Sequence, residues 1–395
     1  MKIAMVGIRG VPARYGGLET CAEEVGARLA ERGHEVVCYC RRGFPHDGMK
    51  EHRGIRRIEL PRLKAKFTDT YSHTLLCMFH VLRLKPDAIL AFNPGISTLC
   101  VIPKVFGMKV ALNPDGFDWR RRKWNWLAKF FIYASARFSA RIVDQLIIDS
   151  VTVHDYYSEI FRCKRRPIYI PNGANIESSE NPEILRDYGL EKDGYFLFLS
   201  RFVPENSCDV VIRAFEGLKT DKKLVMGGGS IEDGKYAARL MATQDKRIIF
   251  PGPIYDPLHV KELHCGCYAL IHGNQPGGTS LGLLRALGYG TCVLTLNTSD
   301  NAYAVKGAGI TYELSPEDLR RHMQDLLDNP EKVNFIRLRT AGRIREEYLW
   351  DMVTDRYERT LISLTGFGSR VSGLGSQTSG PERPKPGTRN PRPGE

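Results

Sequence analysis

The sequence has no long apolar run. Nowhere in its 395 residues does an uninterrupted apolar stretch approach the roughly 18 residues that a membrane-spanning helix requires. The apolar start, residues 1–7, is too short and too soon interrupted by Gly7 to be the hydrophobic region of a secretory signal peptide. The sequence therefore predicts a protein that neither spans a membrane nor is secreted.

The sequence also lacks the patterns that mark metal sites. Its ten cysteines show no paired C-x-x-C spacing and no clusters with histidine, and no D-x-D pair stands in a suitable loop. The cysteines stand singly or as Cys38-Tyr39-Cys40 and Cys265-Gly266-Cys267, in or beside segments that read as buried strands. No metal site is predicted, and reduced thiols of this kind fit a cytoplasmic protein.

Acidic residues are outnumbered by basic ones. The chain has 57 Lys and Arg against 45 Asp and Glu, a net charge of +12, which favours anionic partners such as phosphorylated small molecules, acidic lipids or nucleic acid. Signatures of helix-turn-helix, RRM, KH and zinc-finger domains are absent. We therefore do not expect nucleic acid as a partner.

Strands and helices alternate along the chain in two series, enough for two domains. Short apolar strands are predicted at 3–6, 34–40, 86–92, 109–115 and 145–150, and again at 195–200, 223–229, 247–252, 267–273 and 292–296. The polar, turn-rich segment 170–183 separates the series, and residues 366–395, almost without apolar side chains, are predicted to be disordered. This rhythm predicts an α/β protein with two doubly wound parallel sheets facing a cleft.

The stretch "GIRGVPARYGGLET", residues 7–20, joins the first strand to the first helix. Glycines allow close backbone approach, and a helix N-terminus attracts anions, so the loop is suited to a phosphate. A nicotinamide dehydrogenase is one alternative, with Arg41 and Arg42 after the second strand taking an NADP phosphate. The spacing of Gly7, Gly10 and the Gly16-Gly17 pair does not fit the G-x-G-x-x-G fingerprint of that class.

Two loops of the second series repeat this design. "SRFVPEN", residues 200–206, places Arg201 after a strand, and a planar guanidinium suits phosphate oxygens. "HGNQPGGTSLGLLRALGYG", residues 272–290, places a glycine pair, Thr279 and Ser280 before a helix. Two walls of one cleft could thus share a diphosphate.

Five stretches together carry a resemblance to a known family: "GIRGVPARYGGLET", "NPDGFDWRRRKW", "PNGAN", "SRFVPEN" and "GGTSLGLLRALGYG". From Met1 to about Leu364 the chain resembles retaining glycosyltransferases of family 4 with the GT-B fold, in the branch of bacterial rhamnosyltransferases of polysaccharide assembly. The likeness implies an acceptor-side Rossmann-like domain formed by residues 1–178 and a returning helix at 348–364. Residues 179–347 would form the Rossmann-like domain that binds the nucleotide sugar.

The resemblance also implies roles for individual residues. Asp115, Arg201 and Glu205 would be catalytic, with Arg201 stabilising the leaving diphosphate. The donor would be bound by Gly16, Gly17, Arg201, Asn206, Tyr255, His272, Gly277, Gly278, Thr279, Ser280 and Arg285. The acceptor side would comprise Arg14, Tyr15, Gly116 and Trp119.

The main candidates also have structural alternatives. The Gly16-Gly17 pair could simply form a tight turn, and Arg201 could make an ion pair between domains. Asp115 could cap a turn, His272 could be a strand-end histidine with its hydrogen bonds satisfied, and Glu205 could stabilise a helix start.

Two positions depart from the family pattern. The Glu-x7-Glu pair of the family would fall on Gly277 and Arg285. The rhamnosyltransferase-like branch tolerates the glycine, but the second glutamate normally binds ribose hydroxyls, and arginine offers no acceptor. Arg285 could reach a phosphate instead. The departure leaves two other hypotheses open: a catalytically weakened subunit that binds a partner or glycan, and a sugar-nucleotide epimerase.

The resemblance implies a retaining, metal-independent transfer of a sugar, rhamnose in this branch, from a nucleoside-diphosphate donor. The acceptor would be a glycan or a lipid-linked oligosaccharide of polysaccharide or cell-envelope synthesis. Without a protein nucleophile, a phosphate oxygen of the donor would take the acceptor's proton, while the protein preorganises charge and closes. No cofactor beyond the sugar-nucleotide co-substrate is implied.

Residues 119–143 combine aromatic and basic side chains. Trp124, Leu127, Phe131 and Ala134 keep helical spacing among seven lysines and arginines. The pattern fits a helix lying on an anionic membrane surface, or a buried helix flanked by solvated arginines. In the first case the chain would be a peripheral protein on the inner face of the plasma membrane, acting on a lipid-linked acceptor.

Overall fold

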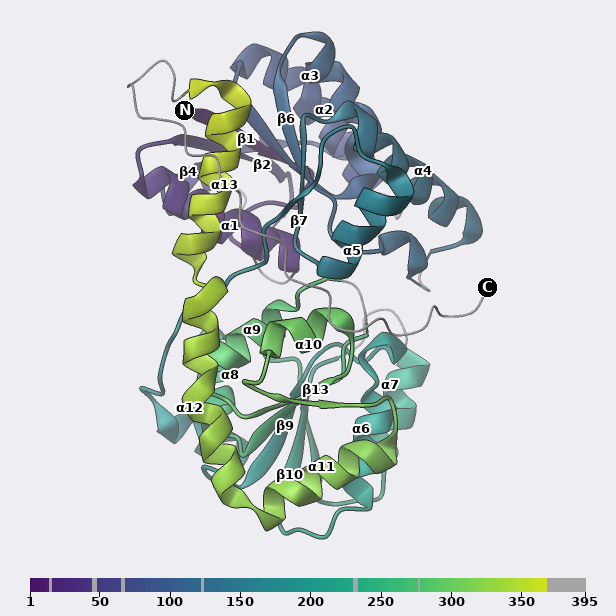
Figure 1. Ribbon diagram of the computed structural model, residues 1–395, viewed down its shortest axis with the longest axis vertical. Coiled ribbons are helices and arrows are strands. Elements are labelled where there is room, and N and C mark those ends of the chain that lie inside the picture. The colour runs from purple at the N-terminus through teal and green to yellow at the C-terminus, as the bar shows by residue number, and fades with distance from the viewer. Residues whose placement is uncertain are drawn as a thin grey trace.

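The computed structural model describes residues 1–13, 16–44, 48–64, 68–121, 124–229, 234–275 and 278–367. Within these ranges the chain forms two α/β domains, one above the other in Figure 1. Arg14, Tyr15, Gly277 and nearly all of the tail predicted for 366–395 lie outside the described residues. No described helix combines the length and apolar character needed to cross a bilayer.

The first domain is built on an eight-stranded sheet of order β3-β4-β2-β1-β5-β6-β7-β8. Its pairs are parallel except for β3 with β4. The strands are β1 (Lys2–Val6), β2 (Glu35–Arg41), β3 (Glu51–His52), β4 (Ile55–Leu60), β5 (Ala88–Phe92), β6 (Lys109–Asn113), β7 (Gln145–Ile148) and β8 (Ile168–Tyr169). The central strands β1 and β5 are almost wholly apolar and buried, because helices cover both faces of the sheet.

One face of this sheet is covered by α1 (Gly17–Glu31) and α13 (Trp350–Thr365). The other face carries most of the remaining helical segments: α2 (Asp69–Leu84), η1 (Pro94–Cys100), α3 (Val101–Val105), η2 (Asp118–Arg120), α4 (Trp126–Ile142), α5 (Val151–Tyr156) and the π-helical turn η3 (Tyr157–Phe161). The result is a three-layer α/β/α domain with the carboxyl ends of its strands pointing to the second domain (Figure 1).

The second domain has a parallel six-stranded sheet of order β11-β10-β9-β12-β13-β14. Its strands are β9 (Tyr195–Leu199), β10 (Lys223–Gly227), β11 (Ile248–Gly252), β12 (Ala269–His272), β13 (Val293–Leu296) and β14 (Ile310–Tyr312). One face packs against α6 (Cys208–Glu216), α7 (Gly234–Met241) and α11 (Pro316–Asp328). The other packs against α8 (Pro257–Gly266), α9 (Leu281–Gly288), α10 (Ser299–Val305) and α12 (Pro330–Glu347), with η4 (Pro182–Tyr188) and η5 (Pro204–Asn206) in the connections.

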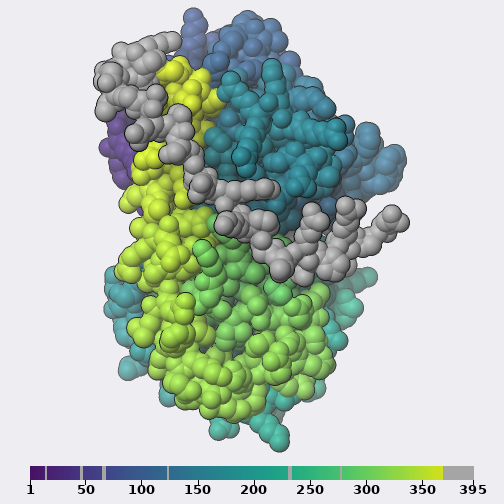
Figure 2. All heavy atoms as spheres, viewed as in Figure 1, coloured from purple at the N-terminus to yellow at the C-terminus, as the bar shows by residue number. Residues whose placement is uncertain are grey.

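The end of the chain returns to the first domain. In Figures 1 and 2 the C-terminal helices run along one side of both domains, with α12 on the second and α13 on the first. Arg28 of α1 forms an ion pair of 3.0 Å with Asp351, and Arg32 pairs with Asp355 at 2.6 Å. The buried rings of Trp350 and Tyr357 complete the core of this face.

The two connections between the domains lie side by side. The amide of Ala174 donates to the carbonyl of Tyr348 at 2.7 Å, where the chain first leaves and later re-enters the first domain. A Cβ at Gly173 would lie 2.5 Å from the Trp350 indole, so only glycine fits beneath that ring. The paired crossing places the strand ends of one domain opposite those of the other.

Candidate active site

Loops that follow the strands of both sheets meet between the domains. The hydroxyl of Thr279, just before α9, donates to the backbone carbonyl of Asp149 at the end of β7. The side-chain amide of Asn172 donates to the carbonyl of Thr279 at 3.2 Å. Ser150 donates to Asp300 of α10 at 2.9 Å. The carboxyl edge of one sheet is therefore in direct contact with the loops of the other.

The glycine-rich loop delivers the N-terminus of α1 to this junction. Gly16 has φ of 120°, and a Cβ there would lie 2.3 Å from the Glu19 carboxylate, so the turn requires glycine. A Cβ on Gly17, the first residue of α1, would lie 3.7 Å from Leu281 Cδ1, the first residue of α9. The starts of two helices from different domains therefore pack together through Leu281. A helix N-terminus presents unpaired amide groups that favour an anion.

The loop after β9 presents an arginine. Arg201 is exposed, and within the described part of the chain its guanidinium makes no ion pair, so the predicted alternative of an interdomain ion pair is not found. Asn206 is buried, and its Nδ2 donates to Ser200 Oγ at 2.7 Å and to the Arg201 carbonyl at 2.8 Å. The carbonyl of Glu205 accepts from the Gln275 amide at 2.9 Å. Asn206 thus shapes the loop that carries Arg201.

His272, the last residue of β12, is satisfied by its neighbours. Its Nδ1 lies 3.0 Å from Thr295 Oγ1 and its Nε2 lies 2.8 Å from Ser280 Oγ. Burial lowers the pKa of His272 to about 4, so the ring is neutral near pH 7. Ser280 also accepts from the Leu283 amide at 3.4 Å as the N-cap of α9. His272 therefore positions the start of α9 through Ser280.

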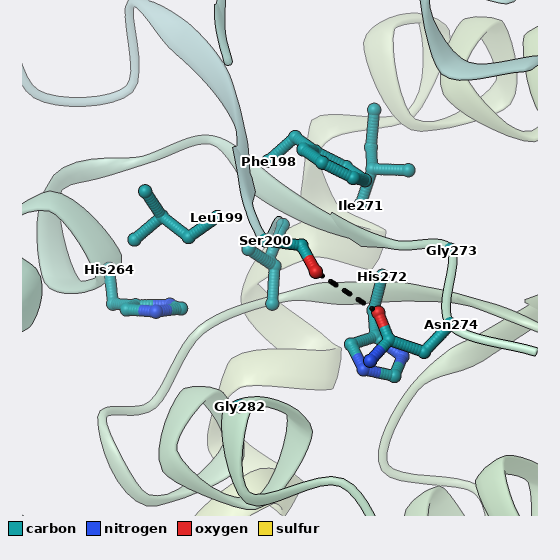
Figure 3. Close-up of a pocket in the computed structure, with 10 residues that line it drawn as sticks. Phe198, Leu199, Ser200, His264, Ile271, His272, Gly273, Asn274 and Gly282 are labelled. Carbon is teal, nitrogen blue, oxygen red and sulfur yellow. Dashed lines mark hydrogen bonds between the residues drawn. The ribbon is translucent and has the colours of Figure 1, made fainter. Parts of the chain in front are cut away.

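A pocket opens beside this histidine, between the ends of β9 and β12 and the start of α9 (Figure 3). His272, His264, Ser200, Asn274 and Gly282 are among its lining residues, and Ser200 Oγ lies 3.5 Å from Asn274 Oδ1. Polar groups therefore line the carboxyl edge of the second sheet. Among the described residues no cluster of His, Cys, Asp and Glu is arranged to hold a metal ion.

Asp115 faces the junction from the loop after β6. Its φ is 61°, and its amide donates to the side chain of Asn113 at 3.0 Å. The Asp115 side chain is 31% exposed, and its Oδ2 lies 3.7 Å from Nη2 of Arg121. Burial raises the pKa of Asp115, while the charge of Arg121 opposes the rise.

Two consecutive family models match the chain. A glycosyl transferase 4-like domain matches residues 16–173, and a glycosyl transferases group 1 domain matches residues 180–341. The chain belongs to the glycosyltransferases of GT-B type. None of the curated proteins compared by sequence matches it.

Solved structures show the same fold at low sequence identity. Sucrose-phosphate synthase from Thermosynechococcus elongatus is 15% identical with a TM-score of 0.79, covering 93% of this chain and 99% of that one. Anabaena HepE in complex with UDP and glucose is 15% identical with a TM-score of 0.75, covering 92% and 100%. WaaG, a glycosyltransferase involved in lipopolysaccharide biosynthesis, is 15% identical with a TM-score of 0.70, covering 93% and 100%.

The glycosyltransferase has a second acidic group at the junction, which the sequence analysis did not single out. Asp149 follows β7 and is only 4% exposed. Its Oδ2 accepts from Asn172 at 2.8 Å, whereas its Oδ1 has no hydrogen-bond partner. Both oxygens would lie 3.7 Å from a Cβ on Gly278 of the second domain. In the sequence, Asp149 stands directly after the apolar strand residues of "QLIIDS". This position at a strand end could have marked Asp149 as a candidate site residue, but the stretch was used only to predict the strand.

The environment of Asp149 favours its protonated form. Burial raises its pKa to about 8, and the neighbouring carboxyls of Asp115 and Asp300 add to the rise. Burial also raises the pKa of Asp300, which belongs to the other domain. The junction between the domains thus contains a carboxyl group that carries a proton at neutral pH.

The remaining predicted residues lie in different surroundings. Trp119 is buried among Phe117, Tyr133, Tyr156 and Phe161, which leaves its indole in the core of the first domain and not on an acceptor surface. Gly116 beside it is also buried.

Tyr255 and Arg285 are both on the surface of the second domain. Tyr255, after β11, is 63% exposed, so its ring is free to stack on a ligand. Arg285 is exposed on α9 and lies close enough to His264, a pocket residue, to help burial lower the pKa of that histidine to about 3. Arg285 belongs to α9, the helix whose N-terminus faces the junction.

Proposed function

We propose that the protein transfers a sugar, with retention of configuration, from a nucleoside-diphosphate donor to a glycan or lipid-linked oligosaccharide. The observation that carries the proposal is the contact between the starts of α1 and α9, together with Ser200, which precedes Arg201 and lines the same pocket as Gly282 of α9. That arrangement supplies amide groups from both domains and one guanidinium, the donors that a leaving diphosphate needs.

The proposed roles follow from this geometry. Gly16, Gly17, Thr279 and Ser280 form the walls that face the diphosphate, and Arg201 neutralises the charge that develops as the glycosidic bond breaks. A phosphate oxygen of the donor takes the acceptor's proton in place of a protein base. The proposed reaction also uses neither a metal ion nor a protein nucleophile. Asp115 and Asp149 border the space for the transferred sugar.

The donor and its setting are also proposals. HepE is described as a complex with UDP and glucose, and WaaG as an enzyme of lipopolysaccharide biosynthesis, which supports a sugar nucleotide and an envelope glycan here. The motifs of the sequence favour rhamnose as the sugar. We propose that the protein works on the cytoplasmic face of the membrane.

Donor-dependent product formation tests the function. We expect the purified protein, given a panel of nucleotide sugars and lipid-linked acceptors, to release nucleoside diphosphate only when both substrates are present. Arg201→Ala should lower kcat/KM by about 3 kcal/mol of transition-state stabilisation, or more than a hundredfold. Arg186→Ala, an exposed arginine of η4 on the same domain, is the matched control and should retain full activity.

Arg285 supports a second candidate, a weakened subunit that binds a partner or glycan without transfer. No turnover and no donor binding across the panel would favour that candidate. Consumption of donor without any acceptor would indicate an epimerase. Equal activity of Arg201→Ala and Arg186→Ala would contradict the proposed diphosphate site.

A further inference from the structure

Helix α4 exposes its large apolar side chains. The residues that face the domain are mostly small: Ile132, Ser135, Ala136, Ser139 and Ala140. On the opposite side Trp126 is 78% exposed, Phe130 is 65% exposed, and Leu127 and Phe131 are also exposed. An ordinary surface helix buries its bulky apolar residues and exposes polar ones, and α4 does the reverse.

The exposed residues form one patch. Positions 126, 127, 130 and 131 are spaced by one and four residues, so they share one side of the first turns of the helix. The ring of Phe131 also contacts Tyr71 of α2, 5.9 Å between centroids. Single exposed apolar residues are ordinary on protein surfaces, whereas a contiguous group of this size marks an interaction site.

All the charged residues of the segment that contains this patch, residues 119–143, are basic. No aspartate or glutamate occurs between residues 119 and 143, while Arg120, Arg137 and Arg141 are exposed there. The amide of Lys164 donates to the carbonyl of Ala140, which brings the exposed basic run of residues 164–166 to the end of α4. An apolar helix face bordered by cations is complementary to an anionic lipid surface.

The patch is also continuous with the candidate site. Arg121 contacts both Asp118, at 3.1 Å, and Asp115, at 3.7 Å, and the indole of Trp124 donates to Asp118 at 3.2 Å. The segment that borders the proposed sugar position therefore leads directly into α4. In Figure 1, α4 lies at the outer edge of the first domain, on the side away from α13.

We propose that the exposed face of α4, formed by Trp126, Leu127, Phe130 and Phe131, lies in the interface of an anionic bilayer and holds the first domain on it. The aromatic and leucine side chains enter the acyl boundary, and the flanking arginines and lysines bind lipid phosphates. Membrane binding by this surface would bring a lipid-linked acceptor to Asp115. Only this last point rests on the proposed function.

Vesicle binding by the full-length protein tests the proposal. Sucrose-loaded vesicles of phosphatidylcholine, with or without phosphatidylglycerol, are sedimented with the wild type and with the double variant Trp126→Ser/Phe130→Ser. The wild type should bind the anionic vesicles at least about tenfold more strongly than neutral ones, with binding weakened by salt, and the variant should lose about tenfold or more.

The control is a matched apolar pair on the second domain. Phe335 and Leu338 of α12 are 58% and 84% exposed, and Phe335→Ser/Leu338→Ser should bind vesicles like the wild type. Equal binding by all three proteins, or no binding by the wild type, would overturn the proposal. Concentration-dependent self-association that only the α4 variant loses, without vesicle binding, would overturn it in favour of a second copy as partner.

A soluble acceptor separates this proposal from the transferase. On such an acceptor the α4 variant should turn over donor at the wild-type rate, since its changes lie outside the donor loops. Loss of vesicle binding with intact turnover supports the lipid surface, whereas absent turnover with intact vesicle binding contradicts the transferase alone.

Discussion

At the scale of single residues, the junction between the domains contains carboxyl groups that are poorly solvated. Asp149 has one oxygen without a partner and lies near the carboxyls of Asp115 and Asp300. A buried charge is costly unless it is paired, so the proton is retained. Proton loss from Asp149 should therefore weaken the packing of the two domains.

This reasoning predicts how stability changes with pH. An unfolded aspartate ionises near pH 4, whereas Asp149 in the folded protein has a pKa of about 8. Between these values the folded state keeps a proton that the unfolded chain has lost. The contribution of Asp149 to stability is thus full below about pH 4 and falls as pH rises to about 8, by at most about 1.4 kcal/mol per pH unit.

Asp149→Asn replaces the ionisable carboxyl group with a neutral amide while preserving the shape of the side chain. The free energy of unfolding of the variant, relative to the wild type, should increase steadily between pH 5 and pH 8 in denaturant titrations. Asp187→Asn, a change of the same kind at an exposed site, is the control. A difference between wild type and Asp149→Asn that stays constant across this pH range would contradict a buried proton.

At the scale of elements, the donor site depends on where helices begin. Ser280 caps α9 and is held by His272, and Ser315 caps α11 by accepting from the amides of Glu317 and Asp318. Ser280→Ala and Ser315→Ala should each cost about 1 kcal/mol of stability. Only Ser280→Ala should also weaken donor binding, by about fivefold, since it alone disturbs the helix start at the junction.

Titration calorimetry with the donor, beside thermal unfolding of both variants, checks this expectation. Donor affinity that falls equally in both variants would show a general effect of lost stability. Unchanged donor affinity in Ser280→Ala would show that the start of α9 is not part of the donor site.

The sequence predicts the elements that follow the simplest physical rules. The central strands of both sheets are short apolar runs because both their faces are buried, and the structure confirms them. Strand β4 was not predicted, because the charged residues Arg56, Arg57 and Glu59 interrupt its run of apolar residues. In the structure Arg57 is buried and donates to the Val11 carbonyl at 2.7 Å, a tertiary contact that no local pattern reveals.

The candidate site was predictable only in part for the same reason. The glycines and Ser280 carry local signals, because turns and caps restrict residue type. The resemblance placed Trp119 on the acceptor side, and only the fold shows that four other rings enclose it. The sequence shows Asp149 only as an acid after a strand, and the fold reveals its place in the site by bringing Gly278 and Asp300 of the other domain against it.

At the scale of the whole molecule, the two domains are connected twice at one place. The link through Gly173 and Ala174 and the return at Tyr348 lie together. Helix α13 is held on α1 by ion pairs and on the end of β6 by Tyr357, whose hydroxyl accepts from Asn113 at 3.0 Å. Two adjacent connections favour a hinge about one line, so the strand ends on either side can close on a ligand.

The most direct test of the account is a crystal structure of the protein with a bound nucleoside diphosphate. We predict that the diphosphate lies between the N-termini of α1 and α9, within hydrogen-bond distance of backbone amides at both, with the guanidinium of Arg201 on its oxygens. A diphosphate bound to one domain alone, or away from Arg201, would contradict the shared site on which the proposed function rests.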